Sequence, residues 1–229
     1  MAYIRTKKVK GREYQFFGEQ QTIKYLGTVT DPNSEEDAMV KTQVHKDLTF
    51  EEYLNYDDGT NNRYELVDGE LVLMPPASFL HSDIIDFIAD CFKAIASAYQ
   101  LDIKIKSGDV GVKTGIKSSR IPDVAVVDGE VWRSYPRESS AVIQVPLMLA
   151  VEFVSPGSEQ IERDYTDKAS EYQETGIPEY WIVDSIEQKI TVLVLDEGSY
   201  TKTIFTGDET VSSITFPELK LTAAEILSA

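Results

Sequence analysis

Hydrophobic residues recur at helical spacing in two long segments of the chain. In residues 79–99 they form one wide stripe, which predicts an amphipathic helix that packs on a core. A second helix is predicted at residues 161–174, because Gly176 and Pro178 follow it as end signals. Shorter helices are predicted at residues 49–54 and 221–227.

Strand patterns alternate with these helices. Residues 63–67 and 70–74 flank Asp68-Gly69, a turn sequence that is typical of a type I′ hairpin. The apolar run 147–154 is interrupted only by Glu152, and it predicts a central strand that is covered on both faces. Further strands are predicted at residues 103–105, 109–112, 124–127, 180–184, 189–195 and 200–205. This order predicts an α/β fold of the mixed α+β kind, with helices packed on a mixed sheet.

The first part of the chain differs from the rest. Residues 1–45 show no sustained periodicity, and residues 31–37 have the polar composition of a linker. We therefore expect an N-terminal arm, partly irregular, at residues 1–45 and one domain at residues 46–229. The sequence contains no apolar run long enough to span a membrane and no secretory signal at its start. Because a single cysteine, Cys91, also suits a reducing compartment, we expect a cytoplasmic protein.

The charge is strongly acidic but unevenly distributed. A net charge of −17 argues against nucleic acid as a partner, since a polyanion is repelled by the mean field. Two basic runs keep nucleic acid open as a partner, one in residues 1–12 and one in residues 104–120. The members of the second run are Lys104, Lys106, Lys113, Lys117 and Arg120. Such runs are also typical of solvated faces.

Three charged residues occupy positions that the pattern places inside. Glu152 lies in the central strand, and Asp123 follows Pro122 at the start of another strand. At about 100° per residue, Lys168 falls in one inward stripe of the second helix with Ile161, Tyr165 and Tyr172, and it faces Glu152. Two carboxylates on neighbouring strands can hold Mg²⁺ or Mn²⁺, and an ammonium group can stabilise charge on a phosphoryl oxygen. The alternative is a buried Glu152–Lys168 ion pair, with Asp123 as a turn residue.

Two further residues have open roles. Glu65 in the predicted hairpin is either a third carboxylate of the site or an exposed hairpin residue. His81 lies within the apolar arc of the first helix, where it is either a base or a histidine at the edge of the core.

These residues fall in an ordered set of blocks that resembles the Uma family of restriction-endonuclease-like proteins, within the PD-(D/E)xK nuclease superfamily. The resemblance runs from about residue 48 to the C-terminus. The blocks are Arg63-Tyr64-Glu65-Leu66-Val67-Asp68-Gly69-Glu70, His81, Pro122-Asp123-Val124, Val151-Glu152-Phe153-Val154-Ser155-Pro156, Asp164, Lys168, Tyr172, Gly176 and Glu179-Tyr180-Trp181-Ile182-Val183-Asp184.

The resemblance implies a restriction-endonuclease-like αβββαβ core and Mg²⁺-dependent (or Mn²⁺-dependent) hydrolysis of phosphodiester bonds. Asp123 matches the aspartate of the PD block, and Glu152 matches the acidic residue of the (D/E)xK block. The sequence departs from the superfamily pattern at Val154, where the lysine would stand. In the Uma family that lysine is supplied by the following helix, where Lys168 lies.

The first hypothesis is therefore a metal-dependent endonuclease. In this hypothesis Asp123 and Glu152 bind the metal, Glu65 assists them, and Lys168 acts on the attacking water or on the transition state. The nucleic acid, with DNA expected and RNA left open, would approach over residues 104–120, and a homodimer is expected. The alternative is a catalytically degenerate binding or assembly module with the same fold. A glycosidase that uses two carboxylates is a third class, but no spacing singles out such a pair.

Overall fold

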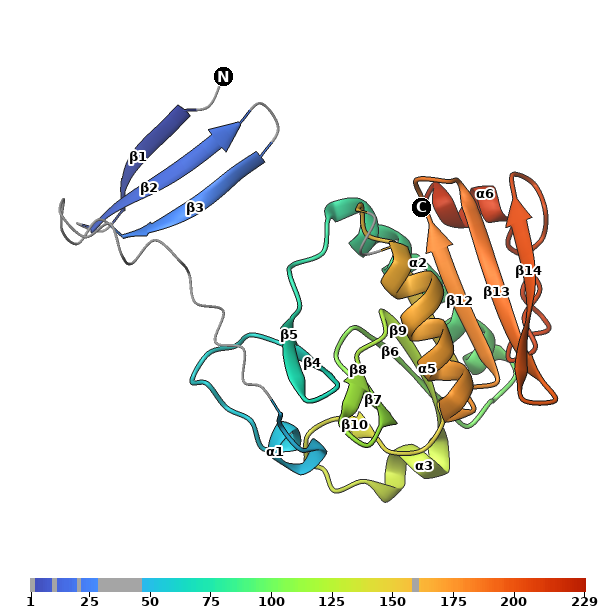
Figure 1. Cartoon of the computed structure of the whole chain (residues 1–229). Helices are drawn as coiled ribbons and strands as arrows, with labels where there is room; N and C mark the ends of the chain where they lie inside the picture. The colour runs from blue at the N-terminus through green and yellow to red at the C-terminus, as the bar shows by residue number, and fades with distance from the viewer. Residues whose placement is uncertain (1–2, 10–11, 20–21, 29–46, 158–160) are drawn as a thin grey trace. The chain divides into compact units, whose positions relative to one another are not determined.

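The computed structural model describes residues 3–9, 12–19, 22–28, 47–157 and 161–229. The chain divides into two compact units, Met1–Val44 and His45–Ala229. The first unit contains an antiparallel sheet of three strands, β1 (Tyr3–Val9), β2 (Arg12–Glu19) and β3 (Thr22–Thr28) (Figure 1). No sequence pattern predicted these strands, and the assignment of residues 1–45 as an arm stays a prediction.

The second unit is built around a six-stranded mixed sheet with the order β14-β13-β12-β11-β9-β6. Its central strand β11 is fully buried, as the apolar run predicted. It pairs in parallel with β12 and antiparallel with β9. The strands are β6 (Ile103–Ser107), β9 (Val124–Asp128), β11 (Leu149–Phe153), β12 (Glu179–Asp184), β13 (Lys189–Asp196) and β14 (Ser199–Thr206).

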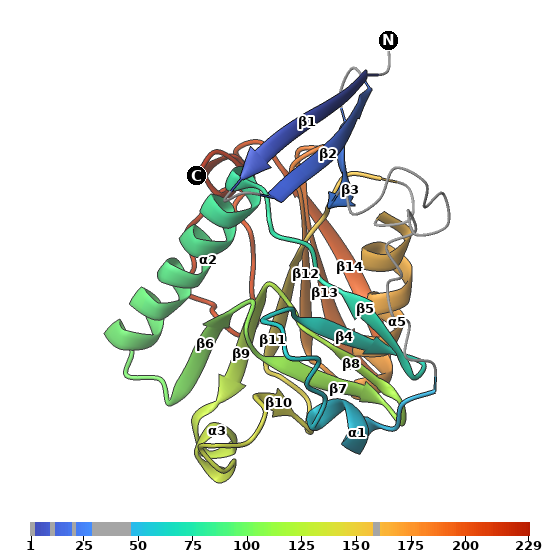
Figure 2. The ribbon, with the colours of Figure 1, turned by 90° about the vertical axis from the view of Figure 1, so that its left-hand side faces the viewer.

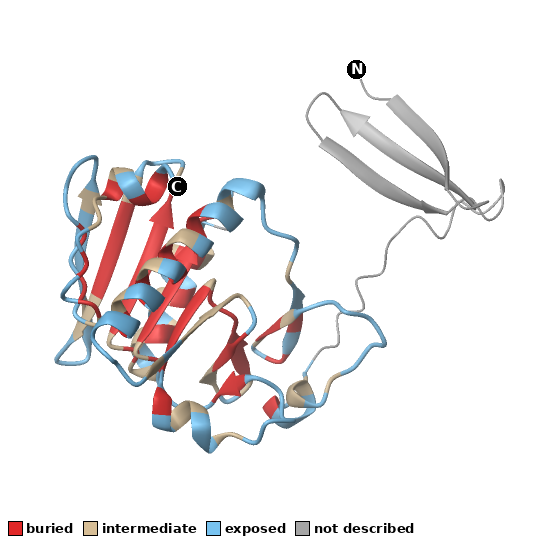
Figure 3. Cartoon of the chain, turned by 180° about the vertical axis from the view of Figure 1, so that it is seen from behind, coloured by how far each residue is buried: buried red, intermediate tan, exposed pale blue. Residues whose placement is uncertain are grey.

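Helices cover both faces of this sheet. Figure 2 shows α2 (Phe79–Ala98) on one side and α5 (Lys168–Thr175) on the other. The short C-terminal helix α6 (Ala223–Leu227) packs on the α2 side. Neighbouring residues of one strand point to opposite faces, so β11 and β12 supply side chains to two separate cores. In Figure 3 the central strands of this sheet are coloured as buried.

A smaller five-stranded sheet, with the order β10-β7-β8-β4-β5, lies in the same unit. The predicted hairpin is confirmed, because β4 (Tyr64–Val67) and β5 (Glu70–Leu73) join through Asp68 and Gly69, both of which have positive φ. The predicted helix after Thr49 is α1 (Phe50–Leu54), which begins with a capping box. No sequence pattern predicted β8, β10 or α3. The remaining elements are β7 (Gly111–Gly115), β8 (Ser118–Arg120), β10 (Val142–Ile143) and α3 (Gly129–Ser134).

The second predicted helix contains a π-turn that the pattern did not reveal. In η1 (Arg163–Asp167) the backbone N–H of Lys168 donates to the carbonyl of Arg163, five residues back. A π-turn advances by only about 80° per residue, so five residues turn the helix by about 90° less than an α-helix would. The prediction that Ile161 shares the inward stripe of Lys168 is therefore wrong: Ile161 is exposed, and Asp164 is buried instead.

The predicted fold class, a mixed α+β sheet with helices packed on its faces and a C-terminal hairpin (β13 and β14), is confirmed. Among the helices that the structure describes, none is both long and apolar enough to cross a membrane.

Candidate functional site

Asp123 and Glu152 lie next to each other on neighbouring strands. Val151 pairs with Val124 in the antiparallel ladder of β11 and β9. Glu152 is the residue after Val151, and Asp123 is the residue before Val124. Residues that are related in this way stand opposite each other. One carboxylate oxygen of Asp123, Oδ2, accepts a hydrogen bond of 2.7 Å from the backbone N–H of Phe153. The strand register therefore places both carboxylates at one point of the sheet.

Lys168 reaches Glu152 from the helix that covers this face. Its Nζ lies 2.8 Å from Glu152 Oε2, and the hydroxyl of Tyr172 donates to Glu152 Oε1 at 2.7 Å. Lys168 and Tyr172 are four residues apart and share one side of α5, which places both donors over β11. All three side chains are buried, so the ion pair is shielded from water.

Glu65 belongs to the same cluster, and the alternative of an exposed hairpin residue is wrong, since Glu65 is 3% exposed. Its Oε1 accepts from the backbone N–H of Ile121 at 3.0 Å and lies 3.4 Å from Lys168 Nζ. Its Oε2 accepts from Arg120 at 3.1 Å. Both oxygens are thus committed to protein donors, and Glu65 holds Lys168 from the side opposite to the helix.

Asp164 is a fourth carboxylate, which the sequence analysis did not select as a site residue. It is fully buried, it lies 3.8 Å from Lys168 Nζ, and it pairs with Arg163 at 2.9 Å. Besides its place among the family blocks, its spacing of four residues from Lys168 was an available signal. That signal is common on exposed helices, and the π-turn that helps to bury Asp164 has no sequence pattern of its own.

Burial and crowding shift the proton affinities in this cluster. Burial, reinforced by Asp123 and the other carboxylates and opposed by Lys168, raises the pKa of Glu152 to about 8. Burial alone would lower the pKa of Lys168, but the carboxylates outweigh it and hold that pKa above its ordinary value. Burial would likewise raise the pKa of Glu65, yet Lys168 and Arg120 outweigh it and lower that pKa. Without a further cation, Glu152 therefore holds a proton at pH 7, and a cation that takes the place of this proton would stabilise the charged carboxylate.

A second ion pair, between Arg120 and Glu171, adjoins the cluster through Glu65. Arg120 is buried and donates two hydrogen bonds to the carboxylate of Glu171, which also accepts from Thr114 at 2.7 Å. Arg120 thereby links Glu65 on the small sheet to Glu171 on α5. This arrangement corrects the expectation that residues 104–120 form one basic surface for nucleic acid, because Arg120 faces inward.

The other basic residues of that run have separate contacts. Lys106 lies over the ring of Trp132, and Lys113 lies over the ring of Phe50. Lys117 pairs with Asp47. The run is therefore spread over several elements instead of forming a single stripe.

The donor chemistry of Asp123 and Glu152 fits a hard divalent cation. Mg²⁺ is commonly bound by one or two carboxylates and keeps several waters or substrate oxygens. Burial is the main cause of the raised pKa of Glu152, and a cation beside this carboxylate would offset it by stabilising the charged form. Within the described part of the chain, no three or more His, Cys, Asp or Glu side chains are grouped closely enough to enclose a metal ion. The fit is thus to an open site with two protein ligands.

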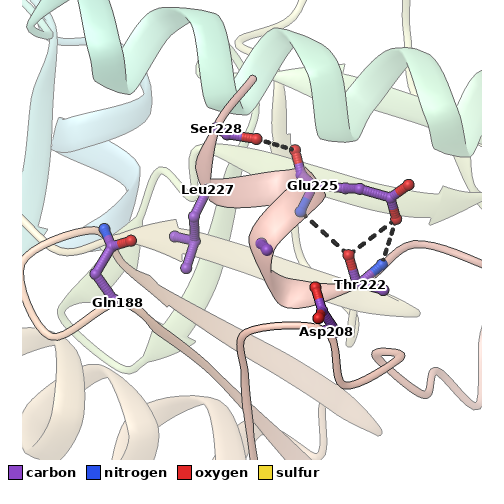
Figure 4. Close-up of a pocket in the computed structure, with 7 residues that line it drawn as sticks. Gln188, Asp208, Thr222, Glu225, Leu227 and Ser228 are labelled. Atoms are coloured by element: carbon purple, nitrogen blue, oxygen red, sulfur yellow. Dashed lines mark hydrogen bonds between the residues drawn. The ribbon is translucent and has the colours of Figure 1, made fainter.

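A pocket of about 560 Å³ lies away from this cluster, beside α6 (Figure 4). Thr222 and Glu225 line it, but each already satisfies the other in the capping box of α6. None of the clustered carboxylates lines it. This pocket therefore does not include the cluster between β11 and α5.

The hydroxyl of Tyr172 allows a direct test of this cluster. Tyr172→Phe is expected to lower the free energy of unfolding by about 2 kcal/mol, because Glu152 loses a buried donor. Tyr200→Phe is the matched control, since its hydroxyl donates at 2.8 Å to a neutral carbonyl, and about 1 kcal/mol is expected there. Urea unfolding at pH 9, where Glu152 is charged, measures both. Equal losses in the two variants would contradict a charged partner for Tyr172.

Comparisons with known proteins agree with this fold. The model of the Uma2 family, described as "Putative restriction endonuclease", matches residues 50–224. No curated protein matches the chain. Among solved structures, the chain is similar to a crystal structure from Anabaena variabilis that is titled a putative nuclease belonging to DUF820. The TM-score is 0.64 at 18% identity, over 79% of this chain and 98% of that chain, so the likeness is one of fold.

Proposed function

The chain belongs to the Uma2 family of restriction-endonuclease-like proteins, and we propose that it is a divalent-metal-dependent nuclease that hydrolyses phosphodiester bonds, with DNA as its expected substrate. One observation carries the proposal: Lys168 lies 2.8 Å from Glu152 although it comes from a different element than the superfamily pattern uses. The carboxylates of Asp123 and Glu152 and the ammonium group of Lys168 therefore lie together, and these are the chemical groups of a nuclease site.

Asp123 and Glu152 would hold Mg²⁺ or Mn²⁺. When bound, the cation supplies Lewis acidity toward a phosphoryl oxygen and toward a water molecule. Asp123 is the more accessible of the two ligands, since its side chain is 17% exposed against 4% for Glu152. Asp123 therefore faces the side from which a substrate phosphate would enter, and Glu152 closes the inner side.

Lys168 is suited to stabilising charge. Because the surrounding carboxylates hold its pKa above the ordinary value, it stays protonated at neutral pH. A protonated amine cannot remove a proton from water, but it can stabilise negative charge that develops on a phosphoryl oxygen. Of the two roles that the sequence analysis left open for Lys168, we therefore favour action on the transition state.

Glu65 and Tyr172 act through their neighbours. Glu65 has both oxygens committed and lies 3.4 Å from Lys168, so we assign it a positioning role instead of metal ligation. Tyr172 holds the inner oxygen of Glu152. Together they fix the distance between the carboxylate ligand and the ammonium group, which a mobile lysine could not maintain.

The degenerate binding module is the second candidate. The net charge of −17 favours it, because this charge repels nucleic acid. The closed network around Lys168 also favours it, since its carboxylates already have cationic partners. Under this candidate the same residues form a structural ion network, and no cation binds to Asp123 and Glu152.

Metal binding separates the two candidates. Calorimetric titration of the full chain with Mn²⁺ is expected to show saturable binding that Asp123→Ala abolishes, because this variant loses one of two ligands. Asp90→Ala is the control for the lost charge: Asp90 is exposed on α2 and pairs only with Lys93 among the described contacts, so binding is expected to persist. Nuclease assays on DNA and RNA with the same proteins then identify the substrate. Absence of Mn²⁺ binding in the unmodified chain, with and without oligonucleotide, would favour the degenerate module.

A further inference from the structure

His81 is placed beside the site by the start of α2. It stands in the first turn, where its backbone N–H donates at 3.2 Å to the side chain of Ser78, the N-cap residue. One turn further along, Ile84, Ile85 and Ile88 are buried against the sheet and anchor the helix. The position of His81 is therefore set by both the cap and the core.

The imidazole of His81 has a fixed orientation. It stacks on the ring of Phe153, with 4.5 Å between ring centroids and 12° between planes. In this orientation its Nε2 lies 2.9 Å from Oδ1 of Asp123. Since Phe153 also donates its backbone N–H to the other oxygen of Asp123, one residue holds both the ring and the carboxylate. His81 is thus neither an isolated core histidine nor a free side chain.

We propose that His81 is a positioning residue for Asp123, which fixes the rotation of that carboxylate for an incoming divalent cation. This inference rests on the proposed function. With His81 on Oδ1 and the N–H of Phe153 on Oδ2, each oxygen keeps one lone pair for another ligand. These lone pairs are what the oriented carboxylate can offer to a cation.

The accessibility of this pair explains why positioning is needed there. The side chains of His81 and Asp123 are 15% and 17% exposed, whereas those of Glu152 and Lys168 are both 4% exposed. Burial, Lys168 and Tyr172 together restrain Glu152. Asp123 lies at the solvent-exposed edge of the site, where a carboxylate without a second partner would rotate. Partners that orient a ligating carboxylate typically contribute 10-fold to 100-fold in metal affinity.

Two substitutions separate the hydrogen bond from the stacking. His81→Phe keeps a flat ring against Phe153 but removes the donor, and His81→Gln keeps a donor at a position similar to Nε2. Calorimetric titration with Mn²⁺ is expected to show about 10-fold to 100-fold weaker binding for the phenylalanine variant. The glutamine variant is expected to recover most of the loss, while thermal unfolding stays close to that of the unmodified chain. If His81→Phe fails to fold, His81→Leu replaces it in the same comparison.

The outcomes distinguish this inference from the proposed function. No Mn²⁺ binding in the unmodified chain overturns the metal site and the inference together. Binding that Asp123→Ala abolishes but His81→Phe leaves unchanged overturns the inference alone, and so does an equal loss in the phenylalanine and glutamine variants. Pulsed electron paramagnetic resonance of bound Mn²⁺ is expected to show no nitrogen coupling from the imidazole; such a coupling would make His81 a ligand and would also overturn the positioning role.

Discussion

Replacing Lys168 with methionine is expected to lower the free energy of unfolding by about 3 to 5 kcal/mol. The substitution removes the cation that Glu152, Glu65 and Asp164 share. Glu65 keeps Arg120 and Asp164 keeps Arg163, so the loss falls mainly on Glu152, which retains only the hydroxyl of Tyr172. Nuclease activity is expected to fall by about 100-fold or more, as for the loss of one donor at a developing charge.

The companion variant tests whether this loss arises from an unpaired charge. Lys168→Met combined with Glu152→Gln removes both members of the ion pair, and it is expected to recover a large part of the stability, because the remaining groups are neutral or paired. Urea unfolding at pH 9, above the pKa of Glu152, measures the single and double variants. A loss within about 1 kcal/mol for Lys168→Met alone would show that Lys168 is not part of a buried ionic network.

Glu152→Gln alone is expected to separate function from stability. Binding of Mn²⁺ should weaken by at least about 100-fold, the upper value for an orienting partner, because a metal ligand is lost. Stability at neutral pH should change little or increase, since the substitution removes a carboxyl whose charged form is disfavoured by burial. Glu179→Gln is the matched control: Glu179 is also buried, on the next strand, but it accepts hydrogen bonds from Trp181 and Ser213 away from the site.

The dependence of stability on pH checks the same residue. The pKa of Glu152 is about 8 in the folded protein, against 4.5 as its ordinary value, so the folded state binds the proton more tightly. The resulting contribution to stability is fully present below about pH 4.5 and is lost as the pH rises to about 8. Without metal, the unmodified chain is therefore expected to become less stable across this range, and Glu152→Gln is expected to show a shallower slope. An unchanged slope in the variant would contradict the raised pKa.

Much of the main sheet could be predicted because its signals are local. The apolar run around Glu152 predicts one strand from a few consecutive residues. The Asp68-Gly69 turn predicts the hairpin in the same way. The facing of Lys168 and Glu152 also followed from sequence, because α5 keeps regular helical spacing from Lys168 onward. A single buried charge in an apolar stripe is conspicuous when the spacing is regular.

The rest depends on contacts that leave no local pattern. β8 and β10 are too short for alternation to emerge. The ion pair between Arg120 and Glu65 joins residues 55 positions apart, and in the sequence Arg120 resembles one more member of a basic run. The π-turn explains both the wrong prediction for Ile161 and the missed burial of Asp164. A helical wheel assumes one constant angle per residue, and that angle changes in the middle of this segment.

The π-turn has a consequence for how this chain could vary in length. Because η1 closes its hydrogen bond over five residues instead of four, it contains one residue more than the α-helix it interrupts. A one-codon deletion there, for example of the exposed Thr166, would let an unbroken α-helix join the same two flanks. Ile161 would stay outward and Lys168 inward. Relatives that are one residue shorter at this point can therefore carry the same lysine in the same place, and an alignment that forces equal length would misplace it.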